Sequence, residues 1–298
     1  MSGPERHAAL TAWVFLAPAL LLITVFFFLP VFAALLLSFT DFDIYALGDL
    51  DRLRFVGFSN YLQLLQSPLF WTALGNTFYF VVVGGPLSVA VSLGAALLVN
   101  SRLTRFPGFF RAAFFLPVVT TLVAVAVVWR YLYHPHYGVL NYGLHLLGIA
   151  PIDWLGDPVW AMPAIILLAV WKNFGFNMII FIAGLQNIPP QLYEAARIDG
   201  ASAWRQFRYL TLPLLGPTFL FVALMTMIGY FQVFAEPYVM TQGGPANRTL
   251  SVVLLMYEEG FRWWNMGYAS ATAFVLFALI LAATLLQLKL RRRNALER

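Results

Sequence analysis

The sequence predicts an all-α protein that crosses a membrane several times. Of its 298 residues, 61% are hydrophobic and only 10% are charged. A water-soluble domain of this length needs more charge to cover its surface, so the bilayer is the expected surroundings. Six apolar stretches are each long enough to cross a bilayer as a helix, which takes about 20 residues. We therefore predict a polytopic membrane protein with six transmembrane helices.

The predicted spans follow one another along the chain, so residues 1–298 are expected to form a single transmembrane domain. The spans cover residues 12–38, 70–99, 110–132, 160–185, 214–236 and 266–288. The second contains Gly84-Gly85-Pro86, which predicts a kink, and the third contains Pro117. The first apolar run, Ala8 to Phe39, is much longer than the core of a signal peptide and is expected to be a retained helix.

The basic residues predict the orientation. With the N-terminus inside, the inner segments hold 12 of the 18 Lys and Arg residues and the outer segments hold 5. Positive charge marks the cytoplasmic side, so both termini are expected there. The basic run Lys289 to Arg293 is read as part of this signal, with anionic lipid binding as the alternative. A net charge of +5 is too sparse to indicate nucleic acid as a partner.

The loop between the fourth and fifth spans, residues 188–213, is the most informative segment. Pro189-Pro190 ends the preceding helix, and residues 191–198 have the length of two helical turns. Gly200 permits a turn, after which residues 203–209 can be helical again. Neither piece is long enough to cross a membrane, and the loop carries five charges. A helix–turn–helix finger on the cytoplasmic side is therefore expected.

The chemistry of this finger suits docking to a partner. The small side chains of Ala195-Ala196 and Ala201 leave a surface that a partner can approach closely. Glu194 offers a carboxylate to a basic partner, and Trp204 and Phe207 offer apolar anchors. The alternative is a loop that only joins two spans, and the pattern by itself does not decide between the two, because amphipathic loops of this kind are common.

The order Glu194-Ala195-Ala196, Asp199-Gly200-Ala201 and Leu212-Pro213 resembles the EAA loop of ABC-type importer permeases. In that family the loop is the coupling helix, which sits in a cleft of the ATPase subunit. The resemblance assigns coupling to Glu194, Ala195, Ala196, Asp199, Gly200, Ala201 and Phe207.

Further segments resemble the sugar-importer branch of this family, and in particular its maltose F-type and glycerol-3-phosphate A-type permeases. They are Phe55 to Tyr61, Asn76-Thr77, Thr241 to Pro245 and Gly267 to Ala271. The large periplasmic insertion of the enterobacterial maltose subunit is missing. The resemblance implies a bacterial inner-membrane protein that works with a second permease, two ATPase subunits and an extracytoplasmic solute-binding protein to import a sugar.

The sequence excludes ATP hydrolysis by this chain. A phosphate-binding loop needs the pattern G-x-x-x-x-G-K-[ST], but the two lysines, Lys172 and Lys289, follow Trp171 and Leu288. No nucleophile–base arrangement is recognisable, so neither an enzyme nor a cofactor is expected. The lack of Cys excludes thiolate metal sites, and His134, His136 and His145 are weak evidence for a metal, so none is expected.

Polar side chains inside the spans suggest a translocation path, because such residues are costly in a bilayer and usually face a cavity or another helix. The candidates are Lys172, Asn173, Gly175 and Asn177 in the fourth span and Tyr230, Gln232 and Val233 in the fifth. Amides, hydroxyls and aromatic rings suit a sugar. The resemblance places Lys172, Gly175, Tyr230 and Val233 at positions that line the substrate site in maltose-type permeases, where they differ from the maltose lining.

Other interpretations of these residues remain open. The polar groups can instead join helices or the two permeases. Lys172 can attract an anionic substrate, such as glycerol 3-phosphate or another sugar or polyol phosphate. A secondary transporter usually needs acidic residues inside its spans, and the sequence offers only Glu236, at the edge of the fifth.

Overall fold

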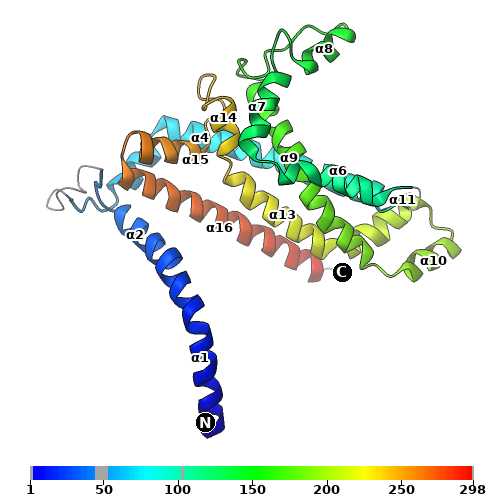
Figure 1. Ribbon diagram of the computed structural model, residues 1–298, viewed down its shortest axis with the longest axis horizontal. Coiled ribbons are helices and arrows are strands. Elements are labelled where there is room, and N and C mark those ends of the chain that lie inside the picture. The colour runs from blue at the N-terminus through cyan, green and yellow to red at the C-terminus, as the bar shows by residue number, and fades with distance from the viewer. Residues whose placement is uncertain (1–2, 44–52, 102–103, 297–298) are drawn as a thin grey trace. The chain divides into compact units, whose positions relative to one another are not determined.

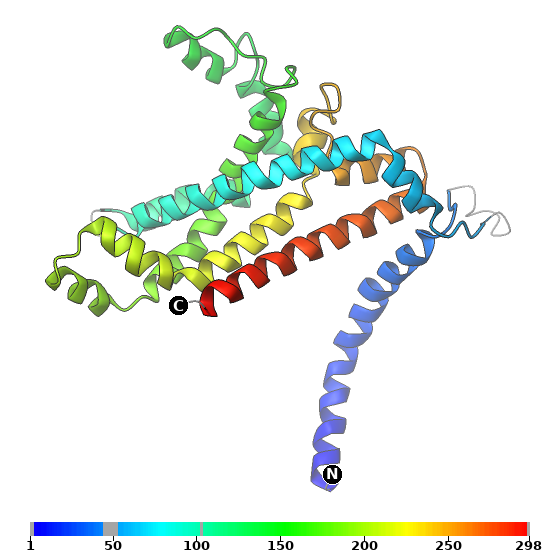
Figure 2. The same ribbon diagram turned by 180° about the vertical axis from the view of Figure 1, so that it is seen from behind.

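The computed structural model describes residues 3–43, 53–101 and 104–296, and its regular elements are helices (Figure 1 and Figure 2). Within those ranges the only β-type pairing consists of two isolated bridges, Thr40 with Phe55 and Asp43 with Asn265. The all-α prediction is therefore confirmed. The chain forms two compact units, Met1–Ser67 with Met256–Phe277 and Pro68–Leu255 with Ala278–Arg298.

The first unit begins with a long apolar helix and continues with short elements. Its elements are α1 (Gly3–Ile23), the π-helical turn η1 (Thr24–Phe28), α2 (Leu29–Leu37), α3 (Ser59–Gln66), the π-helical turn η6 (Glu258–Arg262) and the first part of α16 (Met266–Leu296). The buried amide of Asn60 joins these segments, since its Nδ2 donates to the carbonyl oxygens of Ser38 at 2.9 Å and Thr40 at 2.8 Å. Gly267 lies against the same Thr40 carbonyl, where a side chain has no room.

The second unit contains most of the helices. They are α4 (Pro68–Tyr79), η4 (Phe80–Gly84), α5 (Gly85–Val99), α6 (Pro107–Val119), α7 (Leu122–Leu132), α8 (Val139–Leu146), α9 (Ala161–Gln186), α10 (Pro190–Ile198), α11 (Ala203–Gln206), η5 (Phe207–Thr211), α12 (Leu212–Leu214), α13 (Gly216–Phe231), α14 (Ala235–Met240) and α15 (Val252–Tyr257), which runs into the first unit.

Four continuous helices in the described ranges are long and apolar enough to cross a membrane. They cover Trp13–Leu37, Pro68–Val99, Ala161–Gln186 and Met266–Leu290. Two bent pairs also qualify when each is counted as one span: Pro107–Val119 with Leu122–Leu132, bent by 99°, and Ala203–Leu214 with Gly216–Phe231, bent by 68°. By length and composition, the described helices thus provide four candidate spans, or six when each bent pair is counted as one.

The bends lie close to prolines, but not always where the sequence suggested. At Gly84-Gly85-Pro86, where the sequence predicts a kink, the helix passes through the π-helical turn η4, and Pro68–Val99 continues as one candidate span. The third predicted span is broken after Pro117, at Thr120 and Thr121, whose backbones are extended. The fifth predicted span, 214–236, corresponds to α13, which ends at Phe231, and a turn leads into α14. The bent pair that contains α13 begins at Ala203, so its first half is the second helical piece of the predicted loop 188–213.

The core of the second unit lies where α5, α9 and α13 pack together. Among its buried members are Val89 and Ala96 from α5, Met178 and Phe181 from α9, and Val222 from α13. The most apolar stretch of α9 is 61% buried, whereas the most apolar stretch of the first span is not buried at all. Helix α9 is therefore the centre around which the second unit is built, and it carries four of the predicted site residues.

Candidate functional site

The predicted finger, residues 188–213, forms two short helices beyond the C-terminal end of α9 (Figure 1). Helix α10 ends at Ile198, and Gly200 then adopts a φ of +73°, a left-handed conformation that glycine takes without steric cost. Ser202 caps α11, since its Oγ accepts from the backbone N–H of Arg205 at 3.4 Å. The helix–turn–helix form therefore follows from local sequence.

The finger presents a mixed surface of charge and exposed apolar groups. Glu194, Ala195, Asp199 and Gly200 are exposed, whereas Ala196, Ala201 and Phe207 are half-buried. The sequence analysis missed two large exposed apolar residues, Ile198 (87% exposed) and Tyr209 (77% exposed). Trp204, the proposed anchor, is 70% exposed. Ile198, Trp204 and Tyr209 thus leave three large apolar or aromatic side chains exposed on the finger.

A cavity is lined by residues of the finger, and Phe207 is one of them. It has a volume of about 450 Å³ and is lined by Phe207 together with Tyr193, Arg197 and Thr211 among others. The Tyr193 hydroxyl hydrogen-bonds with Thr211 Oγ1 at 2.9 Å. Phe207 therefore faces the base of the finger, while its ring contacts Trp204 at a centroid distance of 5.6 Å.

A second cavity in the same unit collects most of the predicted path residues. It has a volume of about 490 Å³ and lies among η4, α6, α7, α9, α13 and α14. Its lining comprises Phe80, Val118, Leu122, Asn173, Phe176, Asn177, Met225, Thr226, Gly229, Tyr230, Gln232, Val233, Phe234, Ala235 and Glu236. Five of the seven predicted residues thus share one cavity, and Glu236, which the sequence placed at an edge, joins them.

Tyr230 is the main aromatic group of this cavity. Its side chain is only 6% exposed, and its ring packs against Phe80 with centroids 4.9 Å apart. The tight approach of η4 depends on Gly84, because a Cβ there would lie 2.9 Å from Tyr230 Cε2. The hydroxyl lies near Ser88 and Asn173 without a well-formed hydrogen bond to any described residue. A buried hydroxyl of this kind is available to a polar ligand.

The two asparagine amides of the cavity come from one face of α9. Asn173 and Asn177 are one turn apart and so lie on the same side of the helix. Asn177 Nδ2 donates to Thr226 Oγ1 at 3.0 Å and links α9 to α13, while its Oδ1 remains available as an acceptor. Aromatic rings, amides and hydroxyls in one cavity are the groups that bind the faces and hydroxyls of a sugar ring.

Lys172 and Gly175 occupy the other side of α9 and do not line the cavity. A Cβ on Gly175 would coincide with the Phe114 carbonyl oxygen, so the glycine lets α9 approach the backbone of α6. Lys172 is 8% exposed and its Nζ donates to the carbonyl oxygens of Pro117 at 2.7 Å and Val118 at 3.1 Å. The structure thus divides the predicted path residues into two groups.

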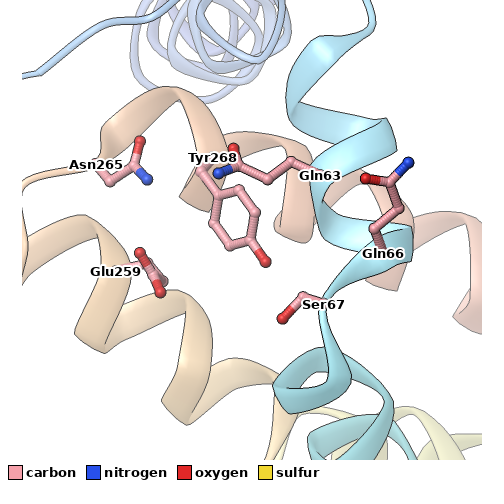
Figure 3. Close-up of a pocket in the computed structure, with 6 residues that line it drawn as sticks. All are labelled: Gln63, Gln66, Ser67, Glu259, Asn265 and Tyr268. Carbon is pink, nitrogen blue, oxygen red and sulfur yellow. The ribbon is translucent and has the colours of Figure 1, made fainter.

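The first unit contains a polar pocket of its own (Figure 3). It has a volume of about 360 Å³ and is lined by Gln63, Gln66, Ser67, Glu259, Asn265 and Tyr268. Burial raises the pKa of the Glu259 carboxyl, and the neighbouring Glu258 adds to this, while a hydrogen bond from Asn265 opposes it. Neighbouring Glu258 pairs with Arg262 at 3.4 Å.

Two of the three histidines considered for a metal, His134 and His136, lie close together in the described structure. His134 stacks on Tyr137 with centroids 3.4 Å apart and lies 5.9 Å from the His136 ring. Across the described ranges, no group of three or more His, Cys, Asp or Glu side chains is arranged to hold a metal ion.

The bent apolar helices, the polar cavity within them and the charged finger define a membrane transport component. Residues 88–295 match the family described as "binding-protein-dependent transport system inner membrane component", and the chain belongs to this family. It is therefore a multi-pass inner-membrane permease of the ABC class and not an enzyme, as the sequence predicted; in this class the ATPase is a separate subunit.

Two curated relatives span almost the whole chain. The lactose transport system permease protein LacF of Rhizobium radiobacter is 38% identical over 291 residues, covering 96% of this chain and 95% of the relative. The trehalose/maltose transport system permease protein MalF of Thermococcus litoralis is 36% identical, with the same coverage of both chains. The resemblance to sugar-importer permeases is thereby confirmed.

A solved structure shares the fold. A chain from the crystal structure of a bacterial alginate ABC transporter, in complex with an alginate pentasaccharide-bound periplasmic protein, superposes with a TM-score of 0.84. It is 22% identical, and the match covers 97% of this chain and 96% of that chain. The ABC permease fold is thus shown.

Proposed function

We propose that this chain is one of two permease subunits of an ABC importer that moves a sugar into the cytoplasm by alternating access. The observation that carries the proposal is the cavity in which Asn173, Asn177, Tyr230 and Gln232 come together from α9 and from the C-terminal end of α13. Relatives named for lactose and for trehalose/maltose support a neutral sugar as the substrate class.

The charge of the cavity favours a neutral sugar over a sugar phosphate. Glu236 lines it, whereas the lining residues in the described part of the chain include neither Lys nor Arg. Lys172 was the residue that suggested an anionic substrate from the sequence. Its ammonium group instead donates to the carbonyls of Pro117 and Val118. Glycerol 3-phosphate and similar anions are therefore the second candidate, because the described lining offers no cationic side chain to bind them.

The finger is proposed to receive the energy of ATP hydrolysis from a partner ATPase. Exposed Glu194 offers a carboxylate, and the exposed Ile198 and Trp204 offer apolar contacts on the same finger. Closure of two ATPase subunits would then draw the two permeases together and turn the cavity from one side of the membrane to the other. A solute-binding protein would deliver the sugar from outside.

The test of coupling is co-purification of the complex with and without a charge reversal at Glu194. Glu194→Lys should insert normally but lose the ATPase and abolish uptake, because it places a cation where the partner is expected to be basic. Glu194→Gln keeps the shape and removes only the charge, so it should weaken the complex without dissolving it. Uptake at the unmodified rate by Glu194→Lys would contradict the coupling role.

The test of substrate class is uptake by the complex in proteoliposomes with its binding protein. Neutral disaccharides and oligosaccharides should be taken up saturably, and glycerol 3-phosphate should neither be transported nor compete. Saturable uptake of glycerol 3-phosphate would favour the second candidate. Uptake that persists without ATP and follows an ion gradient would instead support a secondary transporter.

A further inference from the structure

The break between α6 and α7 exposes backbone groups that must be satisfied inside the membrane. The two helices meet at 99°, with Thr120 and Thr121 in extended conformation between them. The end of a helix leaves its last carbonyl groups without partners within the helix, and in a bilayer each such group costs free energy unless another donor reaches it. The carbonyls at the end of α6 therefore require donors from elsewhere.

Two side chains supply donors to two of these carbonyls, those of Pro117 and Val118. Thr120 Oγ1 donates to the Pro117 carbonyl at 2.6 Å. Lys172 Nζ donates to the same carbonyl at 2.7 Å and to that of Val118 at 3.1 Å. Lys172 reaches this point because Gly175, one turn further along α9, brings the two helices into backbone contact at Phe114. An ammonium group at the C-terminal end of a helix is also favoured by the helix dipole.

The capped break forms part of the cavity wall. Val118 and Leu122 lie on either side of it, and both line the cavity beside Asn173 and Tyr230. The position of α6 against α9 therefore sets the shape of the space in which a substrate would be held.

We propose that Lys172 is a positioning residue that caps the C-terminal end of α6 and fixes the bend between α6 and α7, and that it does not bind the substrate. Its ammonium group has two carbonyl acceptors on α6, and its side chain is outside the lining of the cavity. The proposal rests on the proposed function only in treating the cavity as the sugar path.

The experiment measures the bend directly and transport separately. The chain contains no Cys, so spin labels can be placed at two introduced cysteines, Leu116→Cys on α6 and Val127→Cys on α7, in a complex whose partner subunits lack Cys. The distance distribution between the labels is recorded in nanodiscs for the unmodified Lys172 and for Lys172→Met. We expect a narrow distribution to broaden or shift in Lys172→Met and to be largely restored in Lys172→Arg, which keeps the charge and the donors.

The matched control is Lys289→Met, the same change at the only other lysine of the chain, which is exposed near the end of α16. It should leave the distribution unaltered. In the same complexes without labels, the maximum uptake rate should fall about tenfold or more in Lys172→Met, the scale expected when charged hydrogen bonds are lost. The order of preference among a panel of sugars should not change, because Lys172 does not touch the substrate.

Two results would overturn the proposal. One is a distance distribution in Lys172→Met that matches the unmodified complex. The other is a changed order of sugar preference with unaltered distances, which would make Lys172 a substrate ligand. If Lys172→Met fails to assemble, Lys172→Gln is measured instead and judged by the same two results. Because the distances are measured without transport, a failure of the sugar assignment remains distinguishable from a failure of the cap.

Discussion

The contact between Gly84 and Tyr230 offers a direct test of how the cavity is built. A Cβ at Gly84 would lie 2.9 Å from Tyr230 Cε2, 3.3 Å from Cδ2 and 3.4 Å from Ile166 Cγ2. The Tyr230 ring has little freedom to move away, because it is 6% exposed and packs against Phe80. Gly84→Ala therefore forces the ring out of its position in the cavity.

The magnitude follows from two opposing effects. Overpacking of a well-filled interior costs about 1–3 kcal/mol. Replacing a helical glycine by alanine returns about 0.5–1 kcal/mol. The expected net loss for Gly84→Ala therefore lies between zero and about 2.5 kcal/mol. The neighbouring Gly85 is the matched control, because a Cβ there meets nothing within 4 Å. Gly85→Ala should therefore show only the stabilisation that alanine gives a helix over glycine.

The assay is thermal unfolding of the purified complex in nanodiscs, followed by tryptophan fluorescence, together with the KM for sugar uptake. A change of 1 kcal/mol shifts Tm by about 2–4 °C in domains of 150–250 residues, so the two variants should separate measurably. Gly84→Ala should also raise the KM for sugar uptake. Adding Tyr230→Leu to Gly84→Ala should restore the lost stability, whereas adding Tyr230→Phe should not, because the ring atoms that contact residue 84 remain. Equal Tm values for Gly84→Ala and Gly85→Ala would refute this account of the contact.

Two further changes test the polar contacts. Asn177→Ala should lower the free energy of unfolding by about 0.6 kcal/mol and by no more than about 1.7 kcal/mol, the range for hydrogen bonds between membrane helices. In a double-mutant cycle measured by thermal unfolding, the effects of Asn177→Ala and Thr226→Val should not add. Full additivity would show that the 3.0 Å hydrogen bond contributes nothing. Glu259→Gln should raise Tm at neutral pH and have no effect below about pH 4. Burial raises the pKa of this carboxyl above its unfolded value of about 4.3, so the folded state loses stability as the pH rises from that value through the folded pKa. A Tm difference that does not depend on pH would contradict this.

Asn76-Thr77, one of the segments that resemble the family, makes long-range hydrogen bonds that the sequence did not predict. Asn76 Nδ2 donates to the carbonyls of Asn247 at 2.7 Å and Leu250 at 3.0 Å, which tie α4 to the loop after α14. Thr77 Oγ1 accepts from the backbone N–H of Val252 at 3.0 Å. These partners lie more than 170 positions away along the chain, so local pattern cannot predict them.

The sequence by itself determined the features that depend on composition and local order. Apolar length sets where a helix can cross a bilayer, and the sequence therefore indicated the four long continuous apolar helices within a few residues. The finger was predictable as well, because Pro189-Pro190, Gly200 and Ser202 act on their own neighbours in the chain. The break at Thr120 was not, since Pro117 alone does not specify whether a helix kinks or ends.

Only the tertiary structure decided what the polar residues of α9 do. Helical spacing places Asn173 and Asn177 on one face and Lys172 and Gly175 on another, but spacing does not say which face meets the cavity. Helix α13 packs against one face of α9 and α6 packs against the other. The asparagine amides therefore reach Thr226 and the cavity, and the ammonium group of Lys172 reaches the end of α6. The physical reason is that a polar group in a membrane takes the partner that neighbouring helices bring to it.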